Sequence, residues 1–213
     1  PHAVSSCRVR EAVDFSADFA AAGFTPDESQ YRVVVEHVAR QRLTLLQGPP
    51  GTGKSTTIGN ICLTFVKRKQ GQTLVCTASN AAADRVTVQV CRARVDVLRL
   101  VSEDRPCDVM VPEEATLAYH IGRLRSDAAS EFRELEAIRQ LHDGYLHWKT
   151  HGKRRDTLRR LLEFEVIRSV SVVCCTCVLA GSARLGGLRF RHVIVDEATQ
   201  AIEPQTLIPF VRG

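Results

Sequence analysis

Hydrophobic positions along the chain fall into two alternating patterns. Short apolar runs at 42–47, 72–77 and 95–101 have the length of single strands, and they predict strands that are buried on both faces. The intervening segments 55–69 and 79–93 are instead predicted to be helices, the first with its apolar residues at helical spacing. Strands that alternate with helices are typical of a parallel sheet, so the sequence predicts an α/β fold.

A helix start precedes the first of these strands. Thr25 supplies a capping hydroxyl, Pro26 occupies the first helical position, and Glu28 completes a capping box, which predicts a helix through about residue 40. Residues 1–24 carry no comparable signal, and we interpret them as the tail of a preceding element. The main domain is therefore expected to span 25–213.

The pattern changes over 113–165, which is charged, helix-forming and without strand signals, and we interpret it as an all-helical insertion. Its stretch 149–160 is basic, with Asp156 as the one acid. The cations there are Lys149, Lys153, Arg154, Arg155, Arg159 and Arg160. A solvated helix face and a basic rim beside a nucleic-acid path both explain this pattern. After the insertion, 170–180 and 190–197 predict two more buried strands, followed by a short tail.

Composition limits the class of protein. The 213 residues are 44% hydrophobic and 25% charged, which excludes a disordered chain, and no apolar run approaches the length of a membrane span. The first residues lack the basic and apolar segments of a secretory signal, so we expect a cytoplasmic protein, with the nucleus as the alternative. The net charge of +5 is compatible with binding a polyanion but does not require it.

The cysteines favour a reducing compartment. There are eight, several of them within apolar runs, which does not suggest a disulfide framework. Cys174 and Cys177 form a Cys-x-x-Cys pattern, which fits either a zinc or redox site or a buried strand that uses Cys as a small hydrophobe. Because no second pair lies nearby and the neighbours are apolar, the buried strand is favoured.

A glycine-rich loop lies between the first predicted strand and the helix 55–69. Its sequence, GPPGTGKS, satisfies the pattern of a phosphate-binding loop, in which glycines let successive backbone N–H groups turn toward phosphate oxygens. Lys54 is then expected to reach the β- and γ-phosphates of a nucleotide, and the Ser55 hydroxyl to bind Mg²⁺. The expected nucleotide-binding residues of this loop are Gly48, Pro49, Pro50, Gly51, Thr52, Gly53, Lys54, Ser55 and Thr56.

Two adjacent carboxylates end the predicted strand 190–197, at the position where open α/β sheets bind ligands. We expect Asp196 to hold Mg²⁺, directly or through water. Glu197 is the candidate general base that orients and deprotonates the attacking water, because hydrolysis needs a proton acceptor near the γ-phosphate. Lys54, Asp196 and Glu197 therefore form the predicted catalytic set for nucleotide hydrolysis.

Four stretches together resemble the first RecA-like domain of superfamily 1 RNA/DNA helicases, in the branch of the nonsense-mediated-decay helicases and senataxin. They are DESQ (27–30), LLQGPPGTGKST (45–56), LVCTASNAAADRV (74–86) and the long stretch 172–209, which contains VVCCTC and IVDEATQAIEP. The resemblance covers about 25–209. It implies a RecA-like P-loop NTPase fold, ATP and Mg²⁺ as cofactors, and ATP-driven 5′-to-3′ movement along single-stranded RNA or DNA.

The resemblance also assigns further residues. Gln30 matches the glutamine that reads adenine through its donating and accepting amide, with an exposed helix glutamine as the alternative. Ser79 and Asn80 match the motif that contacts the nucleic-acid backbone, although Ala78 stands where the family has proline. An Asn N-cap on the following helix is compatible with that role. Gln200 extends the acidic motif, as a phosphate sensor or as a link to nucleic acid.

In this family ATP lies between two RecA-like domains, so we expect a second such domain in the parent chain and weak nucleotide turnover from this part alone. Two other classes stay open. One is an AAA+ type ATPase, because GPPGTGK is common there too. The other is a truncated, non-catalytic module that binds nucleotide or RNA. Against the AAA+ class, Asp196 follows Lys54 by 142 residues (196 − 54), far beyond the usual gap.

Overall fold

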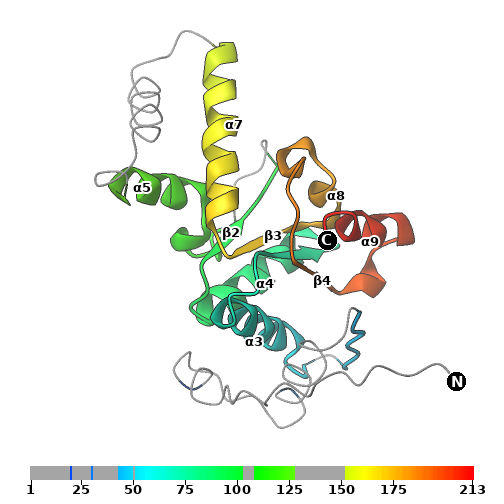
Figure 1. Ribbon diagram of the computed structural model, residues 1–213. Helices are drawn as coiled ribbons and strands as arrows, with labels where there is room; N and C mark the ends of the chain where they lie inside the picture. Colours follow the sequence, from blue (N-terminus) through cyan, green and yellow to red (C-terminus); the bar gives the residue numbers. More distant parts are fainter. Residues whose placement is uncertain (1–19, 21–29, 31–42, 50, 103–107, 128–151) are drawn as a thin grey trace, which may run out of the picture.

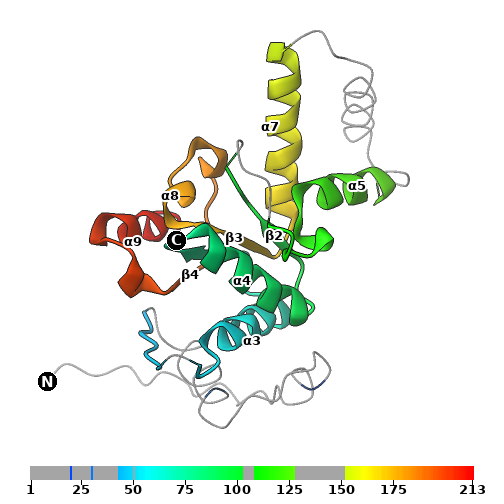
Figure 2. The same cartoon turned by 180° about the vertical axis from the view of Figure 1, so that it is seen from behind.

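The computed structural model describes residues 20, 30, 43–49, 51–102, 108–127 and 152–213. Within these ranges, four parallel strands form one sheet in the order β2-β3-β1-β4. The strands are β1 (Thr73–Thr77), β2 (Val97–Arg99), β3 (Val172–Thr176) and β4 (His192–Asp196). Helices flank this sheet (Figure 1, Figure 2), so the predicted RecA-like α/β fold is confirmed.

The described helices follow the strands in the predicted alternation, and the helices expected at 55–69 and 79–93 are both present. The full set is α3 (Lys54–Lys67), α4 (Asn80–Arg92), α5 (Leu117–Asp127), α7 (Gly152–Ser169), α8 (Cys177–Ala180) and α9 (Glu203–Phe210). Three short 3-10 turns accompany them, η2 (Glu113–Ala115), η3 (Ala183–Leu185) and η4 (Ala198–Gln200).

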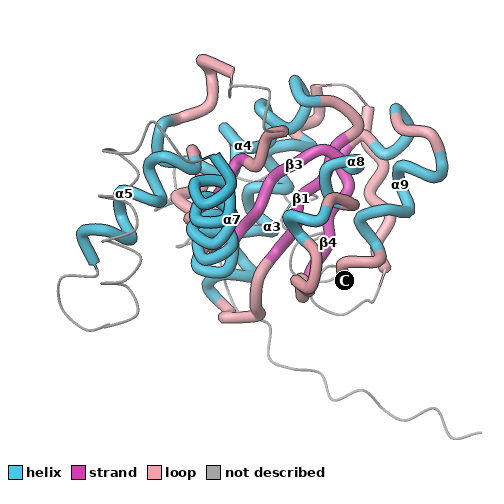
Figure 3. Tube along the Cα trace, turned by 90° about the horizontal axis from the view of Figure 1, so that it is seen from above, coloured by secondary structure: helices cyan, strands magenta, loops and turns pink. Residues whose placement is uncertain are grey.

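The two faces of the sheet are covered by different helices, because successive residues of a strand point to opposite faces. Val75 and Cys174 belong to the core cluster formed with α3 and α4. Leu74 and Val173 belong to the other cluster, formed with the end of α7 and with α8. Figure 3 looks down on this second face, with α7 seen end-on and α8 beside it.

The parallel strands bring their C-terminal ends to one edge of the sheet. Thr77 at the end of β1 lies in register with Thr176 of β3 on one side and with Asp196 of β4 on the other. The turns that follow β1 and β4 therefore leave the sheet side by side. This edge carries the residues that the sequence singled out for chemistry.

One predicted strand is not formed. Residues 43–49 have no regular secondary structure, and Leu43 and Leu45 are 64% and 89% exposed. The prediction of a buried strand over 42–47 is therefore wrong for the part that the structure describes. An apolar run indicates that a segment favours burial, but a strand also needs a neighbour to pair with. Among the described strands, β4 at the edge of the sheet pairs with β1 alone.

Two boundaries near the C-terminus also differ from the predictions. The run 170–180 is not one strand, because β3 ends at Thr176 and the Thr176 hydroxyl accepts a hydrogen bond from the Leu179 N–H at 3.3 Å, which caps α8. The expected tail contains the helix α9, which has a proline in its first turn, where the missing N–H is not needed.

The described parts of the expected insertion are helical, and Figure 1 shows α7 rising away from the sheet with α5 beside it. Residues 128–151 lie outside the described part, so the insertion over 113–165 stays a prediction. The helix α7 continues past residue 165, and Val166 and Ile167 in its last turns are buried against the sheet. One turn earlier, the buried Glu163 pairs with Arg184 of η3.

The N-terminal predictions fall almost entirely outside the described residues. The tail 1–24 and the helix expected from Thr25 are described only at Ala20 and Gln30, which are both helical. Across the described ranges, the structure contains no helix that is long and apolar enough to cross a membrane.

Candidate active site

The phosphate-binding loop leads directly into the N-terminus of α3. Gly51 and Gly53 have φ angles of 80° and 78°, a left-handed conformation that glycine adopts without strain. Gly53 is the N-cap of α3, so the helix begins at Lys54 and the first N–H groups of the helix face the loop. Pro50 lies outside the described residues. The loop has the backbone that an anion-binding helix N-terminus needs.

The Lys54 side chain lies over this loop. Its ammonium group donates hydrogen bonds to the carbonyl oxygens of Gly48 and Pro49, each at 2.8 Å. The Thr52 hydroxyl donates to the same Pro49 oxygen at 2.8 Å. The loop is therefore closed by its own side chains around one positive charge, which phosphate oxygens would attract away from the carbonyl groups.

Ser55 and Thr56 occupy the first turn of α3 and are partly buried. The Thr57 hydroxyl donates a hydrogen bond to the Gly53 main-chain oxygen at 3.1 Å, so its hydrogen is already used within the helix. This leaves Ser55 and Thr56 as the hydroxyl groups that follow Lys54 directly. Their position at a helix N-terminus agrees with the expected role in holding Mg²⁺ and phosphate, which stays a prediction.

Gln30 is brought to the loop from a distant part of the sequence. Its Nε2 donates a hydrogen bond to the Thr52 oxygen at 3.0 Å. A Cβ atom added at Gly53 would lie 2.7 Å from Gln30 Nε2, so glycine also permits this close approach. The structure places Gln30 beside the phosphate-binding loop, while its reading of adenine stays a prediction.

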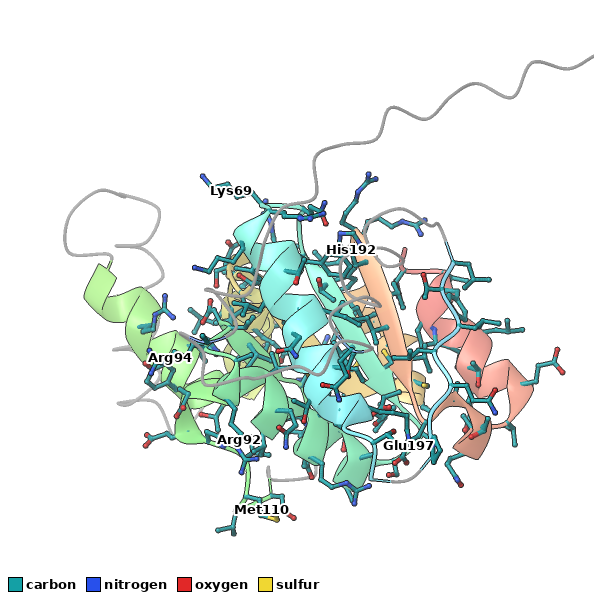
Figure 4. All side chains as sticks on the ribbon, turned by 90° about the horizontal axis from the view of Figure 1, so that it is seen from below. Lys69, Arg92, Arg94, Met110, His192 and Glu197 are labelled. Atoms are coloured by element: carbon teal, nitrogen blue, oxygen red, sulfur yellow. The ribbon has the colours of Figure 1, made fainter. Side chains whose placement is uncertain are left out.

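Asp196 is the last residue of β4, as the sequence predicted, and Glu197 follows it directly. Figure 4 shows Glu197 at this end of the strand. Asp196 is 7% exposed, and its Oδ1 accepts a hydrogen bond from the Glu197 N–H at 3.0 Å. Burial raises the pKa of the Asp196 carboxyl group above its ordinary value, while the nearby charges of Lys54 and Arg85 lower it. Asp196 and Lys54 are therefore close enough to interact, although they are far apart in the sequence.

Glu197 has a left-handed backbone, with φ 51° and ψ 41°, which is uncommon for a residue with a side chain. Strained backbone of this kind costs about 1–3 kcal/mol and clusters at functional sites, although Lys69 and Arg94, outside this site, have a similar φ. Gln200 in η4 donates its N–H to the Glu197 oxygen at 2.8 Å and is exposed. The turn after β4 thus presents the Glu197 carboxylate beside the sheet edge.

Glu197 has a partner that the sequence did not indicate. Arg85 of α4 lies with its Nη2 3.9 Å from Glu197 Oε1. Both side chains are partly exposed, so the pair contributes little to stability. Nothing in the sequence distinguishes Arg85 from other polar residues on a helix surface. Only the parallel order of β1 and β4 brings them together.

The turn after β1 contains the two residues expected to contact nucleic acid. Ser79 is the N-cap of α4, and its hydroxyl accepts a hydrogen bond from the Ala82 N–H at 3.2 Å. The alternative of Asn80 as the N-cap is therefore wrong, because Asn80 is the first residue of the helix. Asn80 Oδ1 instead accepts a hydrogen bond from Arg99 Nη2 at 3.0 Å, a partner that the sequence did not indicate.

The cysteines of the Cys-x-x-Cys pattern lie in different elements. Cys174 is buried in β3, as expected of a small hydrophobe, whereas Cys177 is the buried first residue of α8. Burial raises the pKa of the Cys174 thiol to about 12 and also raises that of Cys177. Thiols with raised pKa values are weak metal ligands and nucleophiles at neutral pH.

The donor set at the sheet edge fits Mg²⁺ and a nucleoside triphosphate. A hydroxyl and a carboxylate are hard oxygen ligands, which Mg²⁺ prefers, and the ammonium group and helix N-terminus suit phosphate. Within the described ranges, no group of three or more His, Cys, Asp or Glu residues could hold a metal ion by itself. Phosphate oxygens would have to complete the coordination of Mg²⁺ here.

The sequence matches the protein family described as AAA domain over residues 25–143 and 125–213. It is 38% identical over 179 residues to the Regulator of nonsense transcripts 1 homolog of Arabidopsis thaliana, an alignment that covers 84% of this chain and 14% of that protein. It is 36% identical over 203 residues to the ATP-dependent helicase NAM7 of Saccharomyces cerevisiae, covering 94% of this chain and 20% of that protein. The predicted resemblance to nonsense-mediated-decay helicases is confirmed by these relatives.

Proposed function

The chain belongs to the AAA-domain family, and from that premise we propose that it is the ATP-binding half of an ATP-dependent helicase acting on single-stranded RNA or DNA in the 5′-to-3′ direction. It spans between 14% and 20% of the length of the relatives described above. We therefore propose that a second RecA-like domain of the parent chain completes the ATP site, and that the parent acts on messenger RNA in the cytoplasm, or in the nucleus.

One observation carries this proposal, namely that a phosphate-binding loop, an acidic pair and a polar turn are neighbours at one sheet edge. Lys54 is close enough to Asp196 to lower its pKa, and Glu197 pairs with Arg85 of the helix that begins at Asn80. A protein that only stored nucleotide would need the loop but not the other two features. Their proximity favours an enzyme that couples hydrolysis to a second ligand.

The ATP-binding role is assigned to the loop and its helix. The backbone from Gly48 to Gly53 accommodates phosphate oxygens, Lys54 pairs with them, and Ser55 and Asp196 hold the metal ion. Bound ATP supplies the γ-phosphoryl group, and bound Mg²⁺ neutralises part of its charge. Gln30, beside Thr52, binds the adenine, and Thr56 and Gln200 complete the set of ATP contacts.

Glu197 is assigned the proton transfer. Its carboxylate follows the strand that ends at Asp196, and it faces the edge of the sheet rather than the core. In hydrolysis it accepts a proton from the attacking water and so raises the nucleophilicity of that water. Asp196 is assigned to the metal ion instead, and its Oδ1 also accepts the Glu197 N–H.

The experiment that tests the proposal measures ATP hydrolysis by the full-length protein with and without single-stranded RNA. We expect Mg²⁺-dependent turnover that rises on addition of RNA, and a fall of roughly 10²–10⁴-fold in Glu197→Gln with ATP binding retained. Glu203→Gln, which changes an exposed carboxylate of α9, is the matched control and should keep full activity.

The other outcomes identify the other classes. A rate of ATP hydrolysis that does not change on addition of RNA or DNA would favour an AAA+ type ATPase. Binding of nucleotide or RNA with no turnover in the full-length protein would favour a non-catalytic module. Loss of ATP binding in Glu197→Gln, with unchanged turnover per bound ATP, would remove Glu197 from the role of general base.

A further inference from the structure

A buried arginine lies beneath the polar turn that follows β1. Arg99 ends β2 and is 1% exposed, and its Nε donates a hydrogen bond to Asp84 Oδ1 at 2.6 Å. Asp84 lies on α4 and is 5% exposed. A buried charge requires a partner, so Asp84 neutralises Arg99 and fixes the direction in which its guanidinium group points.

The two other nitrogen atoms of the Arg99 guanidinium group, Nη1 and Nη2, also donate hydrogen bonds. Nη1 donates to the Leu100 oxygen at 2.6 Å. Nη2 donates to Asn80 Oδ1 at 3.0 Å and approaches the Asn80 main-chain oxygen at 3.4 Å. A guanidinium group has donors and no acceptor, so only the oxygen of the Asn80 amide can face it.

This contact fixes the orientation of the Asn80 side chain. An asparagine amide that is free to turn can offer either its oxygen or its nitrogen to a ligand. With Oδ1 engaged by Arg99, the two N–H donors of Nδ2 lie on the opposite branch of the amide. Donors of this kind match the phosphate and sugar oxygens of a nucleic-acid backbone, which are acceptors.

We propose that Arg99, held by Asp84, is a positioning residue that keeps the donors of Asn80 directed at the nucleic-acid backbone. The inference rests on the proposed role of the Ser79–Asn80 turn in binding single strands. It adds the chemical basis of that role: the Asn80 amide offers its N–H donors to the ligand, because its oxygen is held by Arg99 of the strand β2. Lysine cannot replace Arg99 here, because its single ammonium group lacks the planar fork that reaches Asp84 and Asn80 together.

The test is a double-mutant cycle in the full-length protein, with a fluorescein-labelled oligouridine as the probe and anisotropy as the measurement. Asn80→Ala should weaken binding by roughly ten- to a hundredfold, the loss expected for hydrogen bonds to a charged group. Arg99→Lys should weaken binding by about 3- to 10-fold, since Asn80 remains but is no longer oriented. The double variant should bind no more weakly than Asn80→Ala alone.

A second variant keeps the test decisive if Arg99→Lys fails to fold. Asn80→Asp retains an oxygen for Arg99 and removes both donors, so the protein should unfold at an unchanged or higher temperature and still lose RNA binding. The loss of RNA binding should persist at high salt, whereas repulsion between the new carboxylate and the RNA phosphates would be screened. Gln89→Glu, which adds the same charge in a later turn of α4, controls for that effect and should bind RNA like the wild type.

The outcomes separate this inference from the proposed function. If Arg99→Lys weakens binding equally with and without Asn80→Ala, Arg99 acts only on the fold and the inference is overturned. Binding of RNA by Asn80→Asp as tightly as by the wild type would overturn it as well. If Asn80→Ala itself leaves RNA affinity unchanged, the proposed role of the turn fails first, and the inference fails with it.

Discussion

Arg85 of α4 and Glu197 after β4 form an ion pair across the candidate active site, with 3.9 Å between Nη2 and Oε1. The helix that carries Arg85 begins at Asn80, in the turn proposed to contact nucleic acid. The same helix α4 therefore carries Asn80, which is proposed to contact nucleic acid, and Arg85, which pairs with the candidate general base. Figure 4 shows Glu197 at the C-terminal end of β4, opposite His192 at its start.

Removal of Arg85 should change the pH dependence of the site more than the stability of the fold. Arg85 lowers the pKa of Asp196, which burial raises, so Arg85→Gln should raise that pKa further. Because Mg²⁺ binding requires the ionised carboxylate, the acid limb of the pH profile for Mg²⁺-dependent ATP binding should move to higher pH. Arg92→Gln, at the far end of α4, should leave the profile unchanged. An unshifted profile in Arg85→Gln would show that Arg85 does not act on Asp196.

Loss of Lys54 should weaken nucleotide binding without unfolding the protein. Lys54→Ala removes the charge that the loop holds between Gly48 and Pro49, and loss of such a charge-assisted contact costs about 1.5–3 kcal/mol, or roughly ten- to a hundredfold in affinity. Calorimetric titration with an ATP analogue in the presence of Mg²⁺ measures this change. Lys67→Ala, at the other end of α3, should bind normally, and equal affinities for both variants would contradict the phosphate-loop assignment.

The sequence predicted the order of helices and strands around the site well. The helix that begins at Lys54, the strand before Ser79 and the strand before Asp196 all lie within two residues of their predicted bounds. These elements have short apolar runs or helical periodicity next to a loop motif, and both signals are local. The candidate residues of the loop and of the acidic pair were predictable for the same reason.

The features that were missed depend on pairing between distant segments. The exposure of Leu43 and Leu45 depends on whether their segment pairs with another strand, which no local pattern reveals. The contacts of Arg85 with Glu197 and of Arg99 with Asn80 follow from the strand order β2-β3-β1-β4. Charged side chains on helices and strand ends are mostly solvated, so their sequence gives no sign of such partners.

Asp196→Asn should make the protein more stable at neutral pH while it impairs ATP binding. Since burial raises the pKa of Asp196, the folded protein binds a proton more tightly than the unfolded chain does. Between the unfolded pKa and the raised folded pKa, stability is thus lost as pH rises, and above that window the loss is complete. The asparagine side chain of this variant would carry no charge and could still accept the Glu197 N–H, so the variant should gain about 0.5–2 kcal/mol at pH 7.

Thermal unfolding at several pH values measures the effect of Asp196→Asn. The gain in stability should shrink as the pH falls toward about 4, because the wild-type carboxyl group then becomes protonated as well. Asp108→Asn is the matched control, since Asp108 is exposed and its Oδ1 likewise accepts a backbone N–H. A gain that is the same at every pH would mean that the charge of Asp196 is not its cause.

The basic stretch of α7 and the turn after β1 should affect RNA binding in different ways. Lysine and arginine contacts with phosphates release counterions, so each lost contact should flatten the slope of log affinity against log salt by about 0.7 on a single strand. Arg154→Glu with Arg155→Glu should therefore weaken binding mainly at low salt and reduce the slope. Asn80→Ala should weaken binding at every salt concentration with little change of slope, because its amide carries no charge. Anisotropy of a labelled oligonucleotide across a salt series measures both, and an unchanged slope in the arginine pair would mean that this stretch is only a solvated helix face.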